Sequence, residues 1–176
     1  MKRLPINFRA AVEAIGSDEV PVILIEIRHP ELERPIRLST DNAALIEETP
    51  EGQIRGTRSS WRGADPETEP FLCMMASAVF PSALEQAAEA GSLVLENLHP
   101  EMARLILAFQ DIATISLAAV MADVPEIPIR QSLDLDITSA TITGGEITIQ
   151  YSAESLEAEP WPVTRMTRSN FPGLHK

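Results

Sequence analysis

Cysteine is almost absent from this chain of 176 residues, which contains only Cys73. A single cysteine excludes an internal disulfide bond. Cys73 lies in the apolar stretch 71–75, and a free cysteine in such a setting is usually a buried, unreactive thiol. We therefore predict that Cys73 is part of the hydrophobic core.

Long apolar runs and an excess of basic residues are also missing. No apolar stretch approaches the roughly 20 residues that span a bilayer, so we expect no membrane insertion. Residues 1–5 are basic but no apolar segment follows them, so no signal peptide is predicted and we expect synthesis in the cytoplasm. With 14 Lys and Arg against 26 Asp and Glu, the net charge is −12, which argues against nucleic acid as a partner.

Catalytic and metal-binding motifs are not found either. His29, His99 and His175 have none of the spacings of a zinc or iron site. Asp134 and Asp136 alternate along a predicted strand and should be solvated. The sequence has no Gly-x-Ser-x-Gly nucleophile motif, and Gly144-Gly145 lacks the spacing of a phosphate-binding loop. We predict that the chain is not an enzyme and binds no metal or cofactor.

The patterns that are present predict one mainly β (α+β) domain, residues 1–152, followed by an extended C-terminal arm, residues 153–176. Residues 20–27 are nearly all apolar, as in a central strand buried on both faces, with Pro21 at its start. Residues 35–39 alternate and should pair with that strand as a hairpin. Further strands are predicted by the apolar or alternating stretches 71–76, 92–98, 114–121, 133–138 and 147–151. The last two should form a hairpin around Gly144-Gly145.

Short helices are predicted beside this sheet. Apolar residues recur at helical spacing in 8–15 and again in 102–109, after Pro100. The Ala- and Glu-rich stretch 82–90 also favours a helix.

Residues 40–70 are polar, acidic and rich in Pro and Gly, and we interpret them as a long loop in which only 53–57 could form a strand. A loop of this length suggests binding or ordering on assembly. Trp61 within it leaves two alternatives open. It belongs either to a solvated loop or to an arm that anchors in a neighbouring subunit.

The C-terminal arm contains large apolar residues spread among prolines. Trp161 and Phe171 should dock, either on their own domain or on another subunit. With Trp61, these form a set of candidate intersubunit contacts: Trp61, Trp161, Arg165, Phe171 and Pro172.

The ending of the chain, Glu-Pro-Trp-Pro-Val-Thr-Arg-Met-Thr-Arg-Ser-Asn-Phe-Pro-Gly-Leu at 159–174, resembles the closing motif of an uncharacterised family of phage and prophage proteins encoded among tail genes. Residues 8–11, 24–30, 35–41 and 93–98 follow the order of the same family. The sequence departs from the family at Met166, where an aromatic residue is usual, and at Thr167-Arg168, where a proline is expected.

This resemblance implies a structural component of a bacteriophage tail tip, similar in role to the minor tail proteins of lambda-type phages that join the tail tube to the central hub and fibre. It implies a tail-tube type of antiparallel β-sandwich or barrel. The expected partners are further copies of the chain in a symmetric ring, trimeric or hexameric, and the tube, hub and tape-measure proteins. The expected location is the virion, after synthesis in the host cytoplasm.

Two other functions are considered, and only the first fits the sequence. A tail assembly factor would help tails to form and would leave before the virion matures, so mass spectrometry of purified particles separates it from a structural protein. A cell-wall hydrolase carried by the tail would need a catalytic constellation, and we predict a negative zymogram on peptidoglycan.

Overall fold

The computed structural model describes residues 20–50, 52–79, 90–96, 113–143 and 146–153. These residues form ten strands and a short 3₁₀ turn, η1. The elements are β1 (Pro21–Arg28), β2 (Ile36–Ser39), β3 (Ala44–Thr49), β4 (Gly52–Thr57), η1 (Trp61–Gly63), β5 (Phe71–Cys73), β6 (Met75–Val79), β7 (Ala90–Glu96), β8 (Thr114–Met121), β9 (Arg130–Thr143) and β10 (Glu146–Ser152). The predicted mainly β fold class is confirmed.

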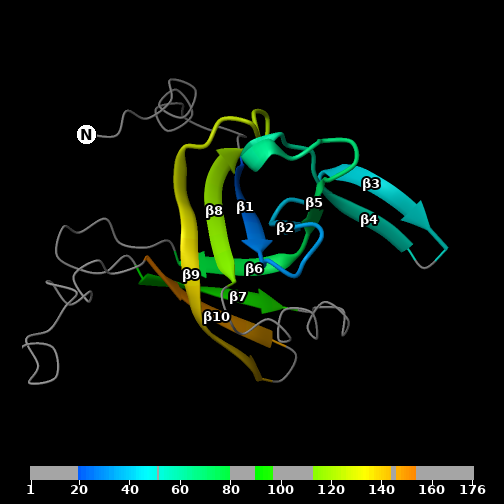
Figure 1. Cartoon of the computed structure of the whole chain (residues 1–176). Helices are drawn as coiled ribbons and strands as arrows, with labels where there is room; N and C mark the ends of the chain where they lie inside the picture. Colours follow the sequence, from blue (N-terminus) through cyan, green and yellow to red (C-terminus); the bar gives the residue numbers. More distant parts are fainter. Residues whose placement is uncertain (1–19, 51, 80–89, 97–112, 144–145, 154–176) are drawn as a thin grey trace, which may run out of the picture.

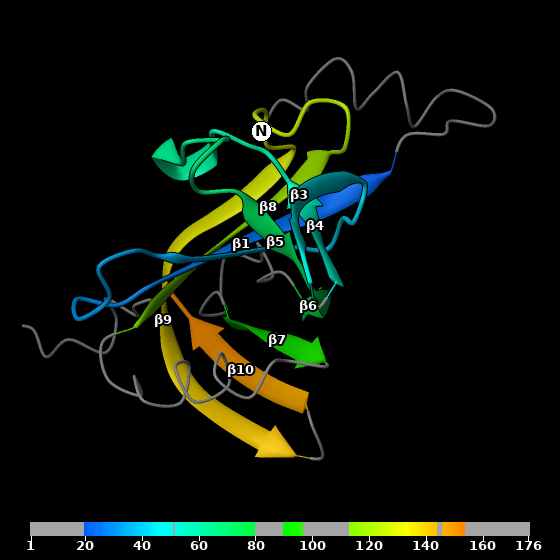
Figure 2. The same ribbon diagram turned by 90° about the vertical axis from the view of Figure 1, so that its right-hand side faces the viewer.

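The strands form one curled sheet in the order β3-β4-β5-β2-β1-β8-β9-β10-β7-β6. Neighbouring strands are antiparallel, except that β2 and β5 are parallel. Only Met74 separates β5 from β6, although the two strands lie far apart in this order. The sheet must therefore curl until its far end meets β5. In Figure 1, β6, β7 and β10 run across the direction of β1, β8 and β9. In the view of Figure 2, turned by 90°, β7 and β10 lie below β1, β5 and β8. This arrangement is consistent with the predicted β-barrel or β-sandwich class.

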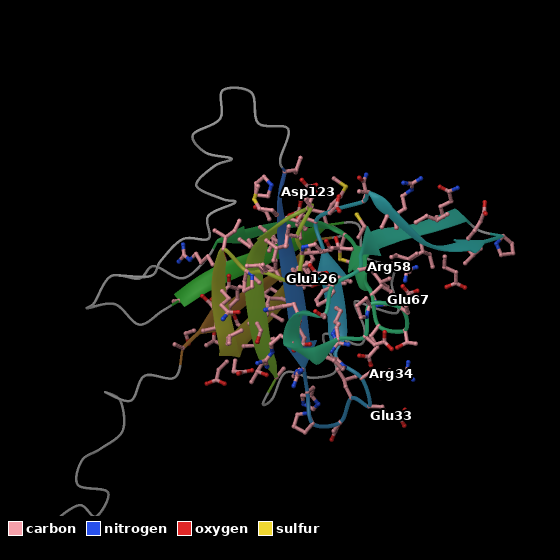
Figure 3. All side chains as sticks on the ribbon, turned by 90° about the horizontal axis from the view of Figure 1, so that it is seen from above. Glu33, Arg34, Arg58, Glu67, Asp123 and Glu126 are labelled. Carbon is pink, nitrogen blue, oxygen red and sulfur yellow. The ribbon has the colours of Figure 1, made fainter. Side chains whose placement is uncertain are left out.

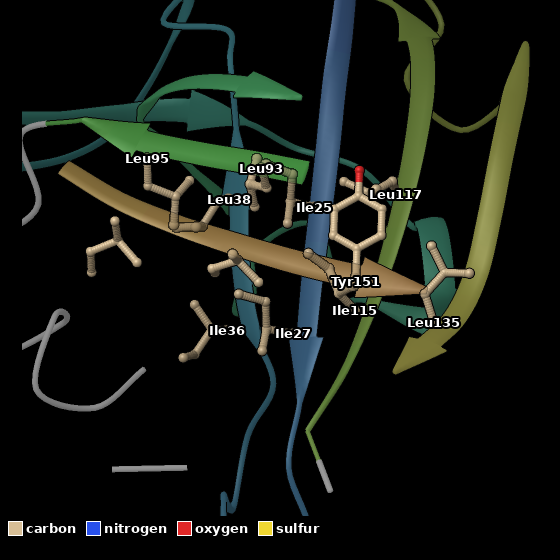
Figure 4. Close-up of a cluster of buried hydrophobic side chains, with 12 residues drawn as sticks. Ile25, Ile27, Ile36, Leu38, Leu93, Leu95, Ile115, Leu117, Leu135 and Tyr151 are labelled. Carbon is tan, nitrogen blue, oxygen red and sulfur yellow. The ribbon is translucent and has the colours of Figure 1, made fainter. Parts of the chain in front are cut away.

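The main core lies inside the curl. Leu93 and Leu95 of β7 face Ile25 and Ile27 of β1 across it (Figure 4). Burying one such side chain contributes about 1.5–3 kcal/mol to the free energy of unfolding. The buried members of this core are Ile25, Ile27, Ile36, Leu38, Leu93, Leu95, Ile115, Leu117, Leu135, Ile147, Ile149 and Tyr151.

A second, smaller core covers the opposite face of β1 and β8. Val22 and Leu24 of β1 pack there with Trp61 and Phe71. Trp61 comes from residues 58–70, which we call the outer loop. Because side chains alternate along a strand, β1 places its even-numbered residues under the outer loop and its odd-numbered ones in the main core. The prediction of a central strand buried on both faces, with Pro21 at its start, is confirmed.

Most other predicted strands are confirmed as well. Residues 114–121 form β8, residues 36–39 pair with β1, and 90–96 form β7. β9 and β10 pair as the predicted hairpin. The predicted helices in 8–15 and 102–109 lie outside the described residues. Of the helix predicted at 82–90, residues 82–89 also lie outside them, and Ala90 is the first residue of strand β7.

Two predictions need correction. Residues 40–70 are not one irregular loop. The strand allowed at 53–57 is confirmed as β4, but 44–49 also forms a strand, β3, which pairs with β4. The alternation predicted from Leu133 onward is interrupted by a bulge, since Asp134 has a φ of +50° and the β8–β9 register shifts opposite it. Leu133 is consequently 40% exposed, whereas Leu135 is buried.

Candidate assembly surfaces

The β3–β4 hairpin extends away from the body of the domain (Figure 1). Only its base is tied to the sheet, where Gly56 and Thr57 pair with β5. A Cβ atom on Gly56 would lie 2.0 Å from the carbonyl oxygen of Phe71, so this close approach requires glycine. Within the described residues, no strand pairs with the outer edge of β3. A free strand edge of this kind is a surface to which another chain can add a strand.

A groove of about 410 Å³ runs between the hairpin and the outer loop. Ile46, Ile54 and Leu72 supply apolar surface, and charged side chains stand among them. We call it the hairpin groove. Its described lining comprises Arg34, Pro35, Arg37, Ile46, Glu47, Ile54, Glu67, Thr68, Glu69, Pro70 and Leu72. A mixed apolar and charged groove beside a free strand edge is typical of a protein-binding surface.

A cluster of charged residues lies beneath the outer loop. Glu26, in the middle of β1, is 1% exposed, and its carboxylate accepts hydrogen bonds from three arginines. The distances to Oε1 are 2.6 Å from Arg28 Nε and 3.1 Å from Arg62 Nε. Arg37 Nε donates to Oε2 at 3.1 Å. A buried carboxylate is tolerated when it is paired in this way.

Two further carboxylates complete the charged cluster. Arg37 Nη1 donates to Glu69 of the outer loop at 2.5 Å. Arg62 donates through both Nη atoms to Asp134 of β9, at 3.3 and 2.5 Å. Three arginines are thus balanced by three carboxylates, and the cluster ties the outer loop to β1, β2 and β9.

Arg62 and Asp134 share an unusual backbone conformation. Their φ angles are +60° and +50°, and they are the only non-glycine residues with positive φ in the described part of the chain. Such conformations cost about 1–3 kcal/mol each and persist where surrounding contacts hold them. The paired hydrogen bonds between the two side chains are one such contact. The backbone amide of Asp134 also donates to Ser116 Oγ at 3.0 Å.

Three charged groups of the outer loop, Arg62, Asp65 and Glu69, have shifted pKa values. Burial by itself lowers the pKa of Arg62, but hydrogen bonds to Glu26 and Asp134 outweigh it and raise the pKa. The hydrogen bond from Arg37 lowers the pKa of Glu69. The pKa of Asp65 is lowered by the hydrogen bond from the backbone of Glu67. These directions keep Arg62, Glu69 and Asp65 charged at neutral pH.

The arginines also line a cavity of about 310 Å³ that opens beside η1. We call it the arginine pocket, and its described lining comprises Arg28, His29, Leu32, Pro35, Arg37, Arg62 and Gly63. No carboxylate is among these residues. The side chain of Arg28 is 47% exposed, whereas that of Arg37 is 6% exposed. Guanidinium groups held by carboxylates behind them present their remaining N–H donors to an incoming anion.

Trp61 is buried by contacts within its own chain. Its side chain is 6% exposed, its ring lies 5.9 Å from that of Phe71, and its Nε1 donates to Gln131. We therefore withdraw Trp61 as an anchor for a neighbouring subunit, because its apolar surface is already buried. The other candidate contacts, Trp161, Arg165, Phe171 and Pro172, lie outside the described residues.

Cys73 is only half-buried, so the prediction of a fully buried thiol is wrong. Burial, together with the charge of Asp41, raises the pKa of the thiol, which keeps it protonated and weakly reactive at neutral pH. Among the described residues, no three His, Cys, Asp or Glu side chains gather where they could hold a metal ion. No described helix is long and apolar enough to cross a membrane.

Sequence reasoning missed the charged cluster. Its one visible signal was Glu26, a carboxylate in the middle of a segment that was itself predicted to be buried on both faces. Such a residue needs cationic partners, and the three arginines supply them. Arg28 and Arg37 lie only 2 and 11 residues from Glu26, whereas Arg62 lies 36 residues away and could not be identified from the sequence.

No model of a protein family matches the chain, and no curated protein is significantly similar to it.

Proposed function

We propose that this chain is a structural subunit of a bacteriophage tail tip, in a ring that joins the tail tube to the central hub and fibre. The observation that carries the proposal is the β3–β4 hairpin. It projects from the curled sheet, is held only at its base and leaves the edge of β3 without a partner in the described residues. In a ring, each subunit needs an element that reaches its neighbour and a rigid body that receives it.

Two other features support the same role. The motif at 159–174 resembles the ending of a family encoded among phage tail genes. β6 is the second edge of the sheet and begins with Met75, which is 64% exposed. Exposed apolar residues at a strand edge favour contact with another protein chain.

The partners in this proposal are further copies of the chain, three or six in number, and the tube, hub and tape-measure proteins. The location is the virion, after synthesis in the host cytoplasm. No catalytic step and no cofactor is part of the proposal.

Cryo-EM of intact tail tips from a phage that carries this gene tests the proposal. The expected result is a symmetric ring of this chain between tube and fibre, with the β3–β4 hairpin on a neighbouring subunit. Mass spectrometry of the same purified particles should detect the chain in stoichiometric amounts. Its absence from well-resolved tails that require the gene would overturn the structural role and favour the assembly factor.

A further inference from the structure

The β3–β4 hairpin ends in an acidic tip. Residues 47–52 contain Glu47, Glu48 and Glu51 and no basic residue. Glu47 and Glu48 are both exposed, and no ion pair involves either of them among the described residues. Glu47 also lines the hairpin groove, whereas Glu48 pairs with Gln53 one step closer to the turn. We call Glu47 and Glu48 the acidic tip.

The arginine pocket is the opposite kind of surface. Three arginines and His29 line it, although the chain as a whole has a net charge of −12. The carboxylates that neutralise the arginines lie outside the lining, and one of them, Glu26, has a fully buried side chain. The guanidinium groups are also held in place before any ligand arrives, since Arg37 and Arg62 each contact two carboxylates. Preorganised donors bind an anion at a lower entropic cost.

The acidic tip and the arginine pocket of one chain face different directions. Seen from above in Figure 3, the hairpin extends to the right, whereas the β1–β2 turn beside the pocket, with Glu33 and Arg34, lies at the lower edge. The paired strands of the hairpin keep its tip from folding back onto this turn. Within one chain, Glu47 and Arg37 both line the hairpin groove. Because side chains alternate along a strand, Glu48 points to the opposite face of the hairpin, so a contact between Glu48 and the arginine pocket requires two copies of the chain.

We propose that the acidic tip of one copy binds in the arginine pocket of the next copy, with glutamate side chains of the tip hydrogen-bonded to Arg28 and Arg37. This contact rests on the proposed function and specifies how the ring would be built. Because the two surfaces differ, the contact is head-to-tail, and repeating it closes a ring when the rotation between copies fits. A contact between opposite charges also weakens as salt screens them.

Charge reversal at the acidic tip tests the contact in the full-length protein. In the variant Glu47→Lys with Glu48→Lys, self-association measured by analytical ultracentrifugation should weaken about tenfold, as expected for the loss of a few charge pairs at an interface. Raising the ionic strength should weaken wild-type association in the same direction. The matched control is Asp123→Lys with Glu126→Lys, which makes the same charge change at two exposed residues remote from the hairpin (Figure 3). This control should associate like the wild type, and equal weakening in both variants would overturn the proposal.

Disulfide trapping tests the same contact where association is weak. In a Cys73→Ser background, Gln53→Cys beside the acidic tip combined with Leu32→Cys in the arginine pocket should give covalent multimers on mild oxidation. Glu126→Cys combined with Leu32→Cys is the control and should remain monomeric. Equal yields from the two pairs would contradict the contact.

These results are separable from those for the proposed function. If the chain is found in tail particles but tip and control variants behave alike, only this contact is wrong. If the tip drives self-association but the chain is absent from particles, only the proposed function is wrong.

Discussion

At the scale of single residues, Glu26 connects the sheet to the loop that covers it. It occupies a position of β1 that alternation points toward the outer loop, next to the apolar contacts of Val22 and Leu24. An unpaired carboxylate there would be strongly destabilising, but three arginines satisfy both of its oxygens. The charged cluster therefore depends on this one residue.

We predict that Glu26→Gln destabilises the fold by about 3–5 kcal/mol, the range for breaking a buried ion pair by removing one partner. The change leaves the buried guanidinium of Arg37 with less negative charge around it. Urea denaturation followed by circular dichroism measures the free energy of unfolding. Glu48→Gln, at an exposed position, is the control and should change it by less than about 0.5 kcal/mol. A loss below about 1 kcal/mol for Glu26→Gln would show that the cluster is not the main attachment of the outer loop.

At the scale of elements, the outer loop is held to the sheet mainly by ion pairs around its single buried tryptophan. Arg62 contacts β1 and β9, Glu69 contacts β2, and Ser59 Oγ donates to the carbonyl oxygen of Pro125. Trp61 and Ala64 provide the apolar part of this contact. The attachment should therefore be sensitive to acid.

We predict that the outer loop loosens as the pH falls below about 4.5, the ordinary pKa of Glu69. The pKa of Glu69 is lowered in the fold by its hydrogen bond from Arg37, so its contribution to stability is present above the ordinary value. That contribution is lost as the pH falls through the lowered value. Asp65, with an ordinary pKa of 3.8 and a lowered one in the fold, acts in the same direction.

Tryptophan fluorescence measures this loosening. A Trp161→Phe variant leaves Trp61 as the only tryptophan, and its emission should shift to the red as the ring becomes solvated in acid. In Glu69→Gln the shift should be smaller, because one of the titrating groups is gone. Emission that stays constant throughout the acid range would contradict the prediction.

At the scale of the whole molecule, the main core is formed by strands from both ends of the described chain. Tyr151 of β10 packs with residues of β1, β7 and β8 and is 1% exposed. Burial raises its pKa from 10.0 to about 12. It is the only tyrosine in the chain, so its ionisation reports on the integrity of the core.

We predict alkaline destabilisation between pH 10 and about 12. Because the pKa of Tyr151 is raised by folding, its neutral form stabilises the native state fully below pH 10, and this contribution is lost as the pH rises toward about 12. The ultraviolet absorbance of tyrosinate, followed with the urea midpoint at each pH, measures both effects. In Tyr151→Phe the stability should fall less steeply over this range. Ionisation at the ordinary value in the folded protein would contradict the burial of the ring.

The sequence by itself determined the strands whose apolar pattern is strong. Residues 20–27, 114–121 and 147–151 were predicted as strands because alternation or continuous apolarity records which faces are buried. In the β3–β4 hairpin, only a strand at 53–57 was foreseen, whereas β3 and its pairing with β4 were missed, because the residues of β3 are largely polar and exposed. A strand that is exposed on both faces carries few apolar residues, so its sequence shows little of the alternation by which strands are predicted.

Only the tertiary structure decided the outcome for Trp61 and the charged cluster. The sequence left Trp61 between a solvated loop and a neighbouring subunit, and folding buries it against Phe71 of its own chain. Glu26, Arg62 and Asp134 come together because β1, the outer loop and β9 are adjacent in the curled sheet, although 72 residues separate Arg62 from Asp134. Periodicity reports the burial of each residue, whereas ion pairs between distant segments depend on how the strands are ordered in space.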